Sequence, residues 1–197
     1  MCRLLLLTFS FFFSIKSLFA QAAWTPVSPN FFPVNASGQI HGISRVSQVK
    51  FHPSNPNKMY AVSSRGGLFI SSNSGASWTI APGCDLLPQM RLNSVCIDHT
   101  NDQVIYLGTG DANYYYSGNG VYKSVNGGAT FTATSLTGRL IVEILMDPSN
   151  QNTLIAATDA GIYKSINGGT SWTLKGSNAL AFRDMLFKAN AGTILNR

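Results

Sequence analysis

The chain has 197 residues, of which 45% are hydrophobic and only 11% are charged, with 14 basic and 8 acidic side chains. Plentiful apolar and aromatic residues exclude a disordered chain. A coiled coil is rich in Glu, and this chain contains only one, so a coiled coil is excluded as well. The surface must therefore take its polarity from Gly, Ser, Thr and Asn, which are typical of turns and of all-β proteins.

Residues 1–22 have the organisation of a secretory signal peptide. Arg3 precedes an apolar run from Leu4 to Ile15, and small residues up to Ala23 follow it. The run is too short for a membrane-spanning helix, which needs about 20 apolar residues. We therefore expect export, with cleavage after Ala20 or Ala22 and no membrane span in the mature protein. An uncleaved N-terminal anchor is the alternative.

Loss of the signal peptide lowers the net charge from +6 by two. So mild a positive charge, without a basic stripe, does not indicate a nucleic-acid partner. Cys84 and Cys96 remain in the mature chain. An exported protein can join them in a disulfide, and two separate buried thiols are the alternative.

The rest of the chain repeats one octapeptide three times, at 71–78, 124–131 and 165–172. The shared pattern is Ser-x-Asn-x-Gly-x-Ser/Thr-Trp/Phe. Its fixed positions are Ser71, Asn73, Gly75 and Trp78, then Ser124, Asn126, Gly128 and Phe131, then Ser165, Asn167, Gly169 and Trp172. We expect the Asn side chain to bond the backbone two residues on. The Gly supplies a positive φ, and the aromatic residue begins a strand and buries its ring.

A second landmark precedes each octapeptide: a polar turn that begins at His52, Asp98 and Asp147 in the three copies. Short β-rich runs flank both landmarks, so each unit contains four strands, here called A to D. The polar turn joins A to B, and the octapeptide joins C to D. The landmarks start 46 and 49 residues apart. Four-stranded units that repeat at such intervals are typical of β-propeller blades. The sequence therefore predicts an all-β propeller.

The octapeptide resembles the Asp-box, or bacterial neuraminidase repeat, with Asn where Asp is commoner. The whole unit is similar to the propellers of sortilin and of xyloglucanases, and to exported Asp-box proteins of Bacteroidetes. The resemblance covers about residues 42–197. It implies a propeller fold, which hosts lectins, receptors and hydrolases alike.

We place the blades at about 43–81, 91–134 and 139–175, and an incomplete fourth at 183–197. Because propellers have about 4–8 blades, we expect residues 43–197 to be the first part of a longer ring. The leader, residues 23–42, contains Trp24-Thr25, which resembles the start of strand D. We expect it to complete the last blade as a clasp.

Strand order puts the A–B and C–D turns on one rim of the propeller and the B–C loops and D–A links on the other. The second rim carries a long B–C loop in blade 2, residues 108–120, with a carboxylate, amides and three aromatic rings. Such a mixture suits a sugar, or it packs over its own blade. Its candidate ligand-binding residues are Asp111, Asn113, Tyr114, Tyr115 and Tyr116.

A basic residue stands at the start of strand A in every unit: Arg45, Arg91, Arg139 and Arg183. Guanidinium groups bind carboxylate or phosphate in bidentate fashion. The four arginines therefore either form an arc that contacts an anionic ligand or pair with backbone carbonyls of neighbouring blades.

Glycoside hydrolysis requires a pair of carboxylates. The acidic residues of the ligand rim, Asp85, Asp111 and Asp159, are each alone in their loops. The resemblance to xyloglucanases implies a catalytic Asp in a loop of the form Thr-Asp-x-Gly-Gly, and Ser64 occupies that position. We therefore assign no catalytic residue. The histidines are scattered, no metal-ligand spacing occurs, and no cofactor motif is present.

We expect a secreted or cell-surface propeller that binds a glycan, a peptide or a protein partner without catalysis. A secreted glycoside hydrolase, with part of its catalytic machinery beyond residue 197, is the alternative.

Overall fold

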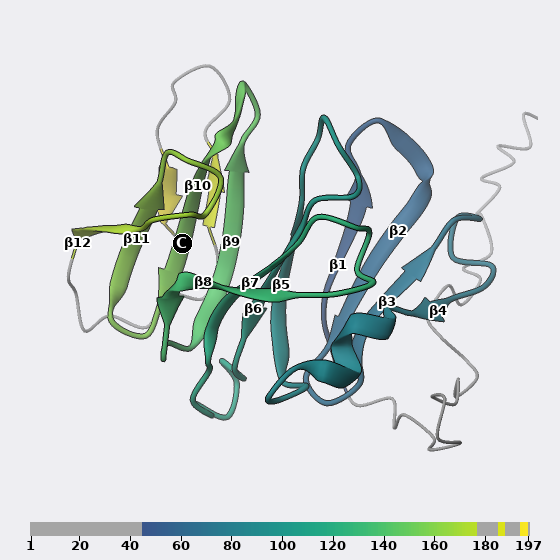
Figure 1. The fold of residues 1–197 in the computed structure, drawn as a ribbon, viewed down its shortest axis with the longest axis horizontal. Coiled ribbons are helices and arrows are strands. Elements are labelled where there is room, and N and C mark those ends of the chain that lie inside the picture. The colour runs from purple at the N-terminus through teal and green to yellow at the C-terminus, as the bar shows by residue number, and fades with distance from the viewer. Residues whose placement is uncertain (1–44, 177–184, 188–193, 197) are drawn as a thin grey trace, which may run out of the picture.

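The computed structural model describes residues 45–176, 185–187 and 194–196, which form three four-stranded antiparallel sheets and one hairpin (Figure 1). We call the sheets blades 1, 2 and 3. Blade 1 comprises β1 (Val46–His52), β2 (Asn55–Ser63), β3 (Gly67–Ser71) and β4 (Thr79–Ile80). Blade 2 comprises β5 (Leu92–Ile97), β6 (Ile105–Thr109), β7 (Gly120–Ser124) and β8 (Thr132–Thr137). Blade 3 comprises β9 (Ile141–Asp147), β10 (Asn150–Thr158), β11 (Gly161–Ser165) and β12 (Thr173–Gly176).

Each blade is a meander, because its strands pair in chain order. A 3-10 turn, η1 (Pro82–Leu86), follows blade 1, and the hairpin pairs β13 (Met185–Phe187) with β14 (Ile194–Asn196). The described residues contain no α-helix. The signal peptide, the leader with Trp24, and Arg183 lie outside the described residues.

The blades stack face to face, and the first strand of each is the innermost (Figure 1). Strand β5 packs against both β1 and β9, and β9 packs against β13. One buried apolar cluster joins blades 1 and 2, for example through Val62 and Val95, and another joins blades 2 and 3 through Tyr106 and Ile144. This stacking of four-stranded meanders confirms the predicted all-β propeller.

The three octapeptides form the same turn. In the first copy the Ser71 hydroxyl donates to Asn73 Oδ1 at 2.9 Å and accepts the backbone N–H of Gly75 at 2.9 Å. The second and third copies repeat these contacts within 0.1 Å. The turn shared by the three copies requires a positive φ at its glycine. The φ of Gly75 is 85°, as the sequence predicts.

The role expected of the Asn side chain was wrong in detail. Asn73 Oδ1 accepts the N–H of Ser77, four residues on and 2.8 Å away, rather than the N–H two residues on. The N–H two residues on, that of Gly75, donates instead to the Ser71 hydroxyl at 2.9 Å, which also accepts the N–H of Asn73 at 3.3 Å. Because the nearer N–H groups donate to the Ser71 hydroxyl, the Asn73 side chain accepts the N–H of Ser77 at the other end of the turn.

The aromatic residues that end the octapeptides pack in different places. Trp78 is 3% exposed and packs on its own blade with Phe69. Phe131 packs against the cluster between blades 1 and 2, and Trp172 against the cluster between blades 2 and 3. Each stands directly before the last strand of its blade. The expected burial of these rings is therefore observed, fully for Trp78 and partly for the other two.

The two rims of the propeller follow from strand direction. The backbone N–H of Ser74 and of Gly168 donates to the carbonyl oxygens of Asn57 and Asn152, which places the octapeptides beside the A–B turns. We call this side the octapeptide rim. The opposite side carries the loops between the second and third strands of each blade, and we call it the loop rim.

Candidate functional site

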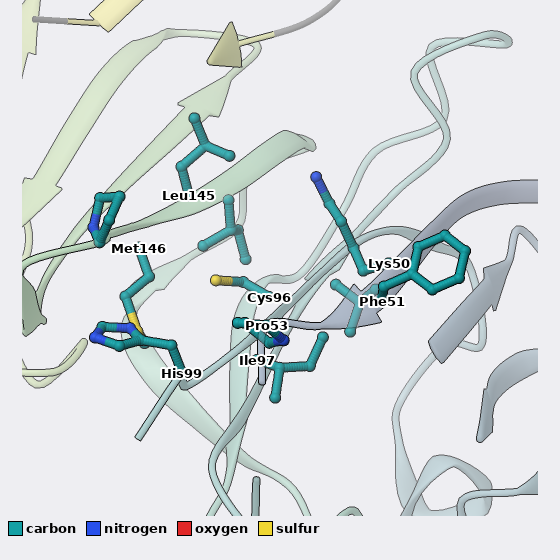
Figure 2. Close-up of a pocket in the computed structure, with 11 residues that line it drawn as sticks. Lys50, Phe51, Pro53, Cys96, Ile97, His99, Leu145 and Met146 are labelled. Carbon is teal, nitrogen blue, oxygen red and sulfur yellow. The ribbon is translucent and has the colours of Figure 1, made fainter. Parts of the chain in front are cut away.

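A hollow of about 390 Å³ lies at the octapeptide rim, where the innermost strands end. Figure 2 shows Phe51, Ile97 and Met146 around it, each directly before the A–B turn of its blade. Most of the lining is apolar, with Lys50, His99 and the thiol of Cys96 as its charged or titratable members. This hollow lacks the convergent polar groups by which a binding site fixes a ligand's orientation.

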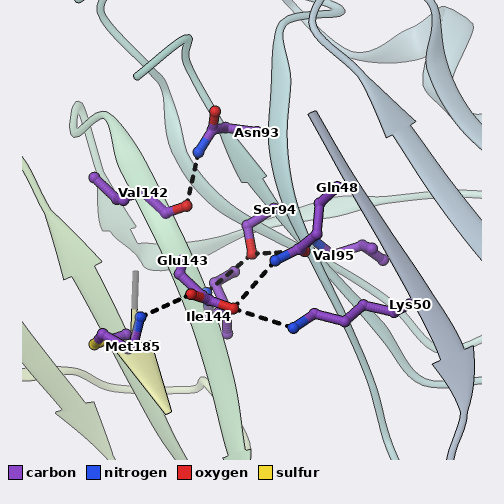
Figure 3. A network of polar contacts seen from close by, with 9 residues as sticks. All are labelled: Gln48, Lys50, Asn93, Ser94, Val95, Val142, Glu143, Ile144 and Met185. Atoms are coloured by element: carbon purple, nitrogen blue, oxygen red, sulfur yellow. Dashed lines mark hydrogen bonds and ion pairs between the residues drawn. The ribbon is translucent and has the colours of Figure 1, made fainter. Parts of the chain in front are cut away.

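A chain of polar contacts crosses the innermost strands (Figure 3). Gln48 Oε1 accepts the N–H of Val95 in the next blade at 2.8 Å. The Ser94 hydroxyl accepts the N–H of Ile144 at 3.0 Å. Glu143 Oε2 accepts the N–H of Met185 at 2.9 Å. We call Gln48, Ser94 and Glu143 the inner-edge relay, because each bonds a backbone group that an edge strand would leave open.

Glu143 is the charged member of the relay. It is 5% exposed, and its Oε1 accepts from Gln48 Nε2 and from Lys50 Nζ, both at 3.1 Å. All three relay residues stand four positions before the A–B turn landmark of their blade. Sequence reasoning missed this role, although that equal spacing was a usable signal. The relay is architectural and leaves the loop rim as the place for a ligand.

At the loop rim the structure brings together the two features that the sequence singled out. Arg45 Nη2 donates to Asp111 Oδ1 at 2.7 Å, so the start of β1 is tied to the long loop of blade 2. The Arg45 guanidinium also lies over the Tyr114 ring at 5.4 Å, and that of Arg91 over the Tyr116 ring at 4.8 Å. Among the described residues, the partners of the two side chains are the Asp111 carboxylate and the Gln89 amide rather than backbone carbonyls.

The long loop is a small hairpin that leans toward blade 1. Asp111 and Tyr116 exchange both backbone hydrogen bonds at 3.1 Å, which pins its base. Tyr115 at its tip has a φ of 53°, an uncommon conformation for a bulky residue. The corresponding connections in the other blades are only residues 64–66 and 159–160.

The loop leaves its aromatic rings open to solvent. Tyr114, Tyr115 and Tyr116 are 67%, 71% and 43% exposed. Tyr114 and Tyr116 face each other at a centroid distance of 6.2 Å. The alternative of a loop that packs down over its own blade does not describe these rings.

Asp111 is the buried carboxylate of the site, at 4% exposed. Burial by itself raises the pKa of Asp111, but the Arg45 hydrogen bond and the N–H of Asn113 at 3.1 Å outweigh it, so the pKa lies below its ordinary value. Asn113 therefore contributes its backbone here. An ionised carboxylate held in this way positions the loop and can accept hydrogen bonds from a ligand.

Six residues line a hollow beside this carboxylate, which we call the rim hollow: Arg45, Ser64, Arg65, Asp111, Tyr114 and Tyr116. Its volume is about 430 Å³. Arg65 joins it from the short loop of blade 1, and sequence reasoning missed this residue because it lies outside the repeated arginine position. Ser64, at the position that the resemblance to xyloglucanases implies for a catalytic Asp, is buried at its edge.

Other candidate residues lie apart from the rim hollow. Arg139 does not line it, and its backbone carbonyl accepts the N–H of Gly120 at 2.9 Å. Asp85 lies in η1 and Asp159 in the short loop of blade 3, and both are exposed. Asp98 and Asp147 each accept two hydrogen bonds within their A–B turns, as expected of turn-forming residues.

The possible Cys84–Cys96 disulfide is absent, and the alternative of two separate buried thiols describes the structure. Cys84 lies in the cluster between blades 1 and 2, and Cys96 in the cluster between blades 2 and 3. Burial raises the pKa of each thiol to about 12. Because the two thiols lie on opposite faces of blade 2, they cannot form a disulfide with each other.

Among the described residues, no three His, Cys, Asp or Glu side chains gather in a way that suits a metal ion. A search of the same residues found no helix with the length and apolar character needed to span a bilayer.

Comparison with known proteins supports the β-propeller fold. No protein-family model matches the chain. A xyloglucanase from Hypocrea jecorina (strain QM6a) is 30% identical over 150 residues, which are 68% of this chain and 16% of that protein. The GH74 xyloglucanase from Xanthomonas campestris matches 69% of this chain and 21% of its own, with a TM-score of 0.55 and 25% identity.

A third match shows the fold alone. The structure of YCF48 bound to D1 peptide covers 73% of this chain and 45% of its own, with a TM-score of 0.53 and 14% identity. The chain is therefore similar to β-propellers of different function. It spans less than a quarter of either xyloglucanase.

Proposed function

We propose that this propeller binds a saccharide at its loop rim, as an exported module of the Asp-box type. The observation that carries the proposal is the rim hollow, in which exposed Tyr114 and Tyr116 stand beside the buried Asp111 that Arg45 holds in place. Flat aromatic rings offer an apolar face to a sugar ring, and a fixed carboxylate accepts hydrogen bonds from its hydroxyls. The signal-peptide pattern at residues 1–22 supports export.

The similarity to xyloglucanases supports a carbohydrate ligand, because those proteins are named for a polysaccharide. The proposal concerns binding by the described blades. The residues that carry it all lie within these blades.

A glycan array followed by titration calorimetry on the full chain tests this function. Tyr114→Ala removes a ring from the rim hollow, so we expect about 10-fold weaker binding, which corresponds to about 1.4 kcal/mol. Ile166→Ala is the matched control, because Ile166 is similarly exposed, at 71% against 67% for Tyr114, but lies in the third octapeptide on the opposite rim. Equal affinity in all three proteins would place the ligand elsewhere.

A glycoside hydrolase is the second candidate, and the same similarity favours it. Hydrolysis needs two carboxylates, and the described lining of the rim hollow supplies one, Asp111. Because the pKa of Asp111 is lowered, this carboxylate suits a base or nucleophile rather than a general acid. A second carboxylate would have to come from outside the described residues.

Incubation of the full chain with xyloglucan and other polysaccharides separates the two functions. For a binding module we expect retention of the polysaccharide without release of reducing ends. Release of reducing ends that Asp111→Asn abolishes would establish the hydrolase instead.

A further inference from the structure

A second hollow adjoins the rim hollow and extends it across the loop rim. Its volume is about 470 Å³, and Arg65, Pro88, Gln89, Met90 and Arg91 line it. Arg65 lines both hollows, so the two form one trough that runs from the long loop of blade 2 to the segment before β5.

The trough carries more positive than negative charge. It contains three arginines and one described carboxylate, Asp111, which is bonded to Arg45. No described carboxylate forms an ion pair with Arg65 or Arg91. Within the described part of the chain, no carboxylate neutralises these two charges.

The surroundings of Arg91 orient its guanidinium. Its Cζ atom lies 4.8 Å from the Tyr116 ring centroid, and Nη1 donates to Gln89 Oε1 at 3.4 Å. A guanidinium held over a ring has further N–H groups to donate, and its planar fork matches the two oxygens of a carboxylate. Arg65 is exposed on the other side of the trough.

We propose that Arg65 and Arg91 bind a carboxylate carried by the saccharide, so that the preferred ligand is an acidic sugar such as a uronic acid. This inference rests on the proposed function. The exposed Tyr114 and Tyr116 rings favour an acidic saccharide over an acidic peptide, because sugar rings present flat apolar faces next to their charged group. The arginines that act differ from the predicted arc: Arg45 is neutralised by Asp111, Arg139 lines neither hollow, and Arg65 takes part.

The test compares two soluble probes of equal length, an oligogalacturonate and the corresponding neutral galacto-oligosaccharide, by titration of the full chain. We expect the acidic probe to bind about 100-fold more tightly, since a hydrogen bond to a charged group contributes a factor of about 10 to 100 in affinity. This preference should shrink as salt is raised, because the charges are solvent-exposed in part.

Single substitutions assign the effect to the two arginines. Arg65→Ala and Arg91→Ala should each weaken the acidic probe about 10-fold and weaken the neutral probe much less, because the neutral probe has no carboxylate for the guanidinium to bind. Arg65→Lys should recover part of the loss, because it restores the charge without the planar fork. Lys175→Ala is the charge-matched control, because Lys175 is exposed on β12, the outermost strand of blade 3, and it should change neither probe.

The outcomes distinguish this inference from the function on which it rests. Equal affinity for both probes, with Tyr114→Ala still harmful, would overturn the acidic ligand and keep the saccharide site. Failure of both probes and of every array glycan would overturn both. Binding of a glutamate-rich peptide as tightly as the oligogalacturonate, without dependence on Tyr114, would also overturn the inference and identify a peptide site.

Discussion

The two rims of this propeller are built on opposite plans. On the octapeptide rim, three turns repeat the same contacts, and the Ser Oγ to Asn Oδ1 distances are 2.9, 2.9 and 3.0 Å. On the loop rim, blade 2 alone has a long hairpin, and the contact between Arg45 and Asp111 has no counterpart in the other described blades.

This difference separates architecture from recognition. A contact that recurs in every blade satisfies a need that every blade has, such as closing a turn or bonding an inner edge. A contact that occurs in one blade alone is not required to build a blade. Binding residues are commonly found on loops of unusual length that a rigid scaffold positions. Repeated contacts should therefore control stability, and single contacts should control ligand binding.

The largest effect should come from Trp78, the most deeply buried of the octapeptide aromatics. It is 3% exposed, and its Nε1 donates to the Gly75 carbonyl oxygen at 3.0 Å. Trp78→Ala leaves a large cavity and should lower the free energy of unfolding by about 4 kcal/mol. Urea denaturation of the full chain measures this loss.

Trp78→Phe is the control, because Phe131 occupies the same position in the second octapeptide. It removes the indole hydrogen bond and part of the volume, so we expect a loss of about 1.5 kcal/mol. An equally large loss for both variants would mean that the indole bond, and not ring burial, carries the position.

Glu143 should give the next largest effect, because it is the charged and buried member of the relay. Glu143→Ala leaves Lys50 and the N–H of Met185 without their acceptor, and we expect a loss of about 3 kcal/mol. Glu143→Gln keeps one acceptor and the shape, so its loss should be about half as large. Saccharide affinity per folded molecule should stay constant in both, and a selective loss of affinity would show that the relay also serves the site.

The contact between Arg45 and Asp111 should affect stability less, and only in one range of pH. Since the folded pKa of Asp111 lies below its unfolded value near 4, its contribution is complete above that value and is lost as the pH falls through the folded pKa. Asp111→Asn should therefore cost about 1 kcal/mol at pH 7 and less at an acidic pH at which Asp111 is protonated in the folded protein.

Urea denaturation at both pH values measures the difference between Asp111→Asn and the natural chain. Asp159→Asn is the control, because Asp159 is exposed and forms no ion pair with a described residue. A cost for Asp111→Asn that is the same at both pH values would show that its backbone hydrogen bond, rather than its charge, stabilises the loop.

The sequence predicted well whatever repeats. Three octapeptides and three polar turns placed the strands, because turn chemistry acts over a few residues and leaves its pattern in the chain. It also singled out the loop of Asp111 and the position of Arg45. What joins them is a contact between residues 66 positions apart, and only the stacking of blades 1 and 2 brings them together.

Three features escaped the sequence for related reasons. The relay role of Glu143 depends on a backbone group of the next blade, and the place of Arg65 depends on the neighbouring long loop. The Asn of the octapeptide bonds four residues on because the Ser hydroxyl already occupies the nearer donors. In each case a competing or distant partner, rather than local propensity, decides the role.

The smallest effect tests the comparison of the rims most directly, because it makes the same change on each. Ser74 in the first octapeptide and Tyr115 in the long loop both have a left-handed backbone, with φ of 57° and 53°. Glycine adopts this conformation without strain, and Gly127 and Gly168 hold the Ser74 position in the other copies. Tyr115→Gly and Ser74→Gly should therefore each change the unfolding free energy by no more than about 0.5 kcal/mol.

Their effects on binding should differ. Tyr115→Gly removes a ring that is 71% exposed beside the rim hollow, so saccharide affinity should fall several-fold, whereas Ser74→Gly on the octapeptide rim should leave it unchanged. Calorimetric titration of both variants, next to their unfolding curves, gives the comparison. If Ser74→Gly weakened the ligand as much as Tyr115→Gly, repetition would no longer distinguish architecture from recognition, because a repeated turn would then belong to the binding surface.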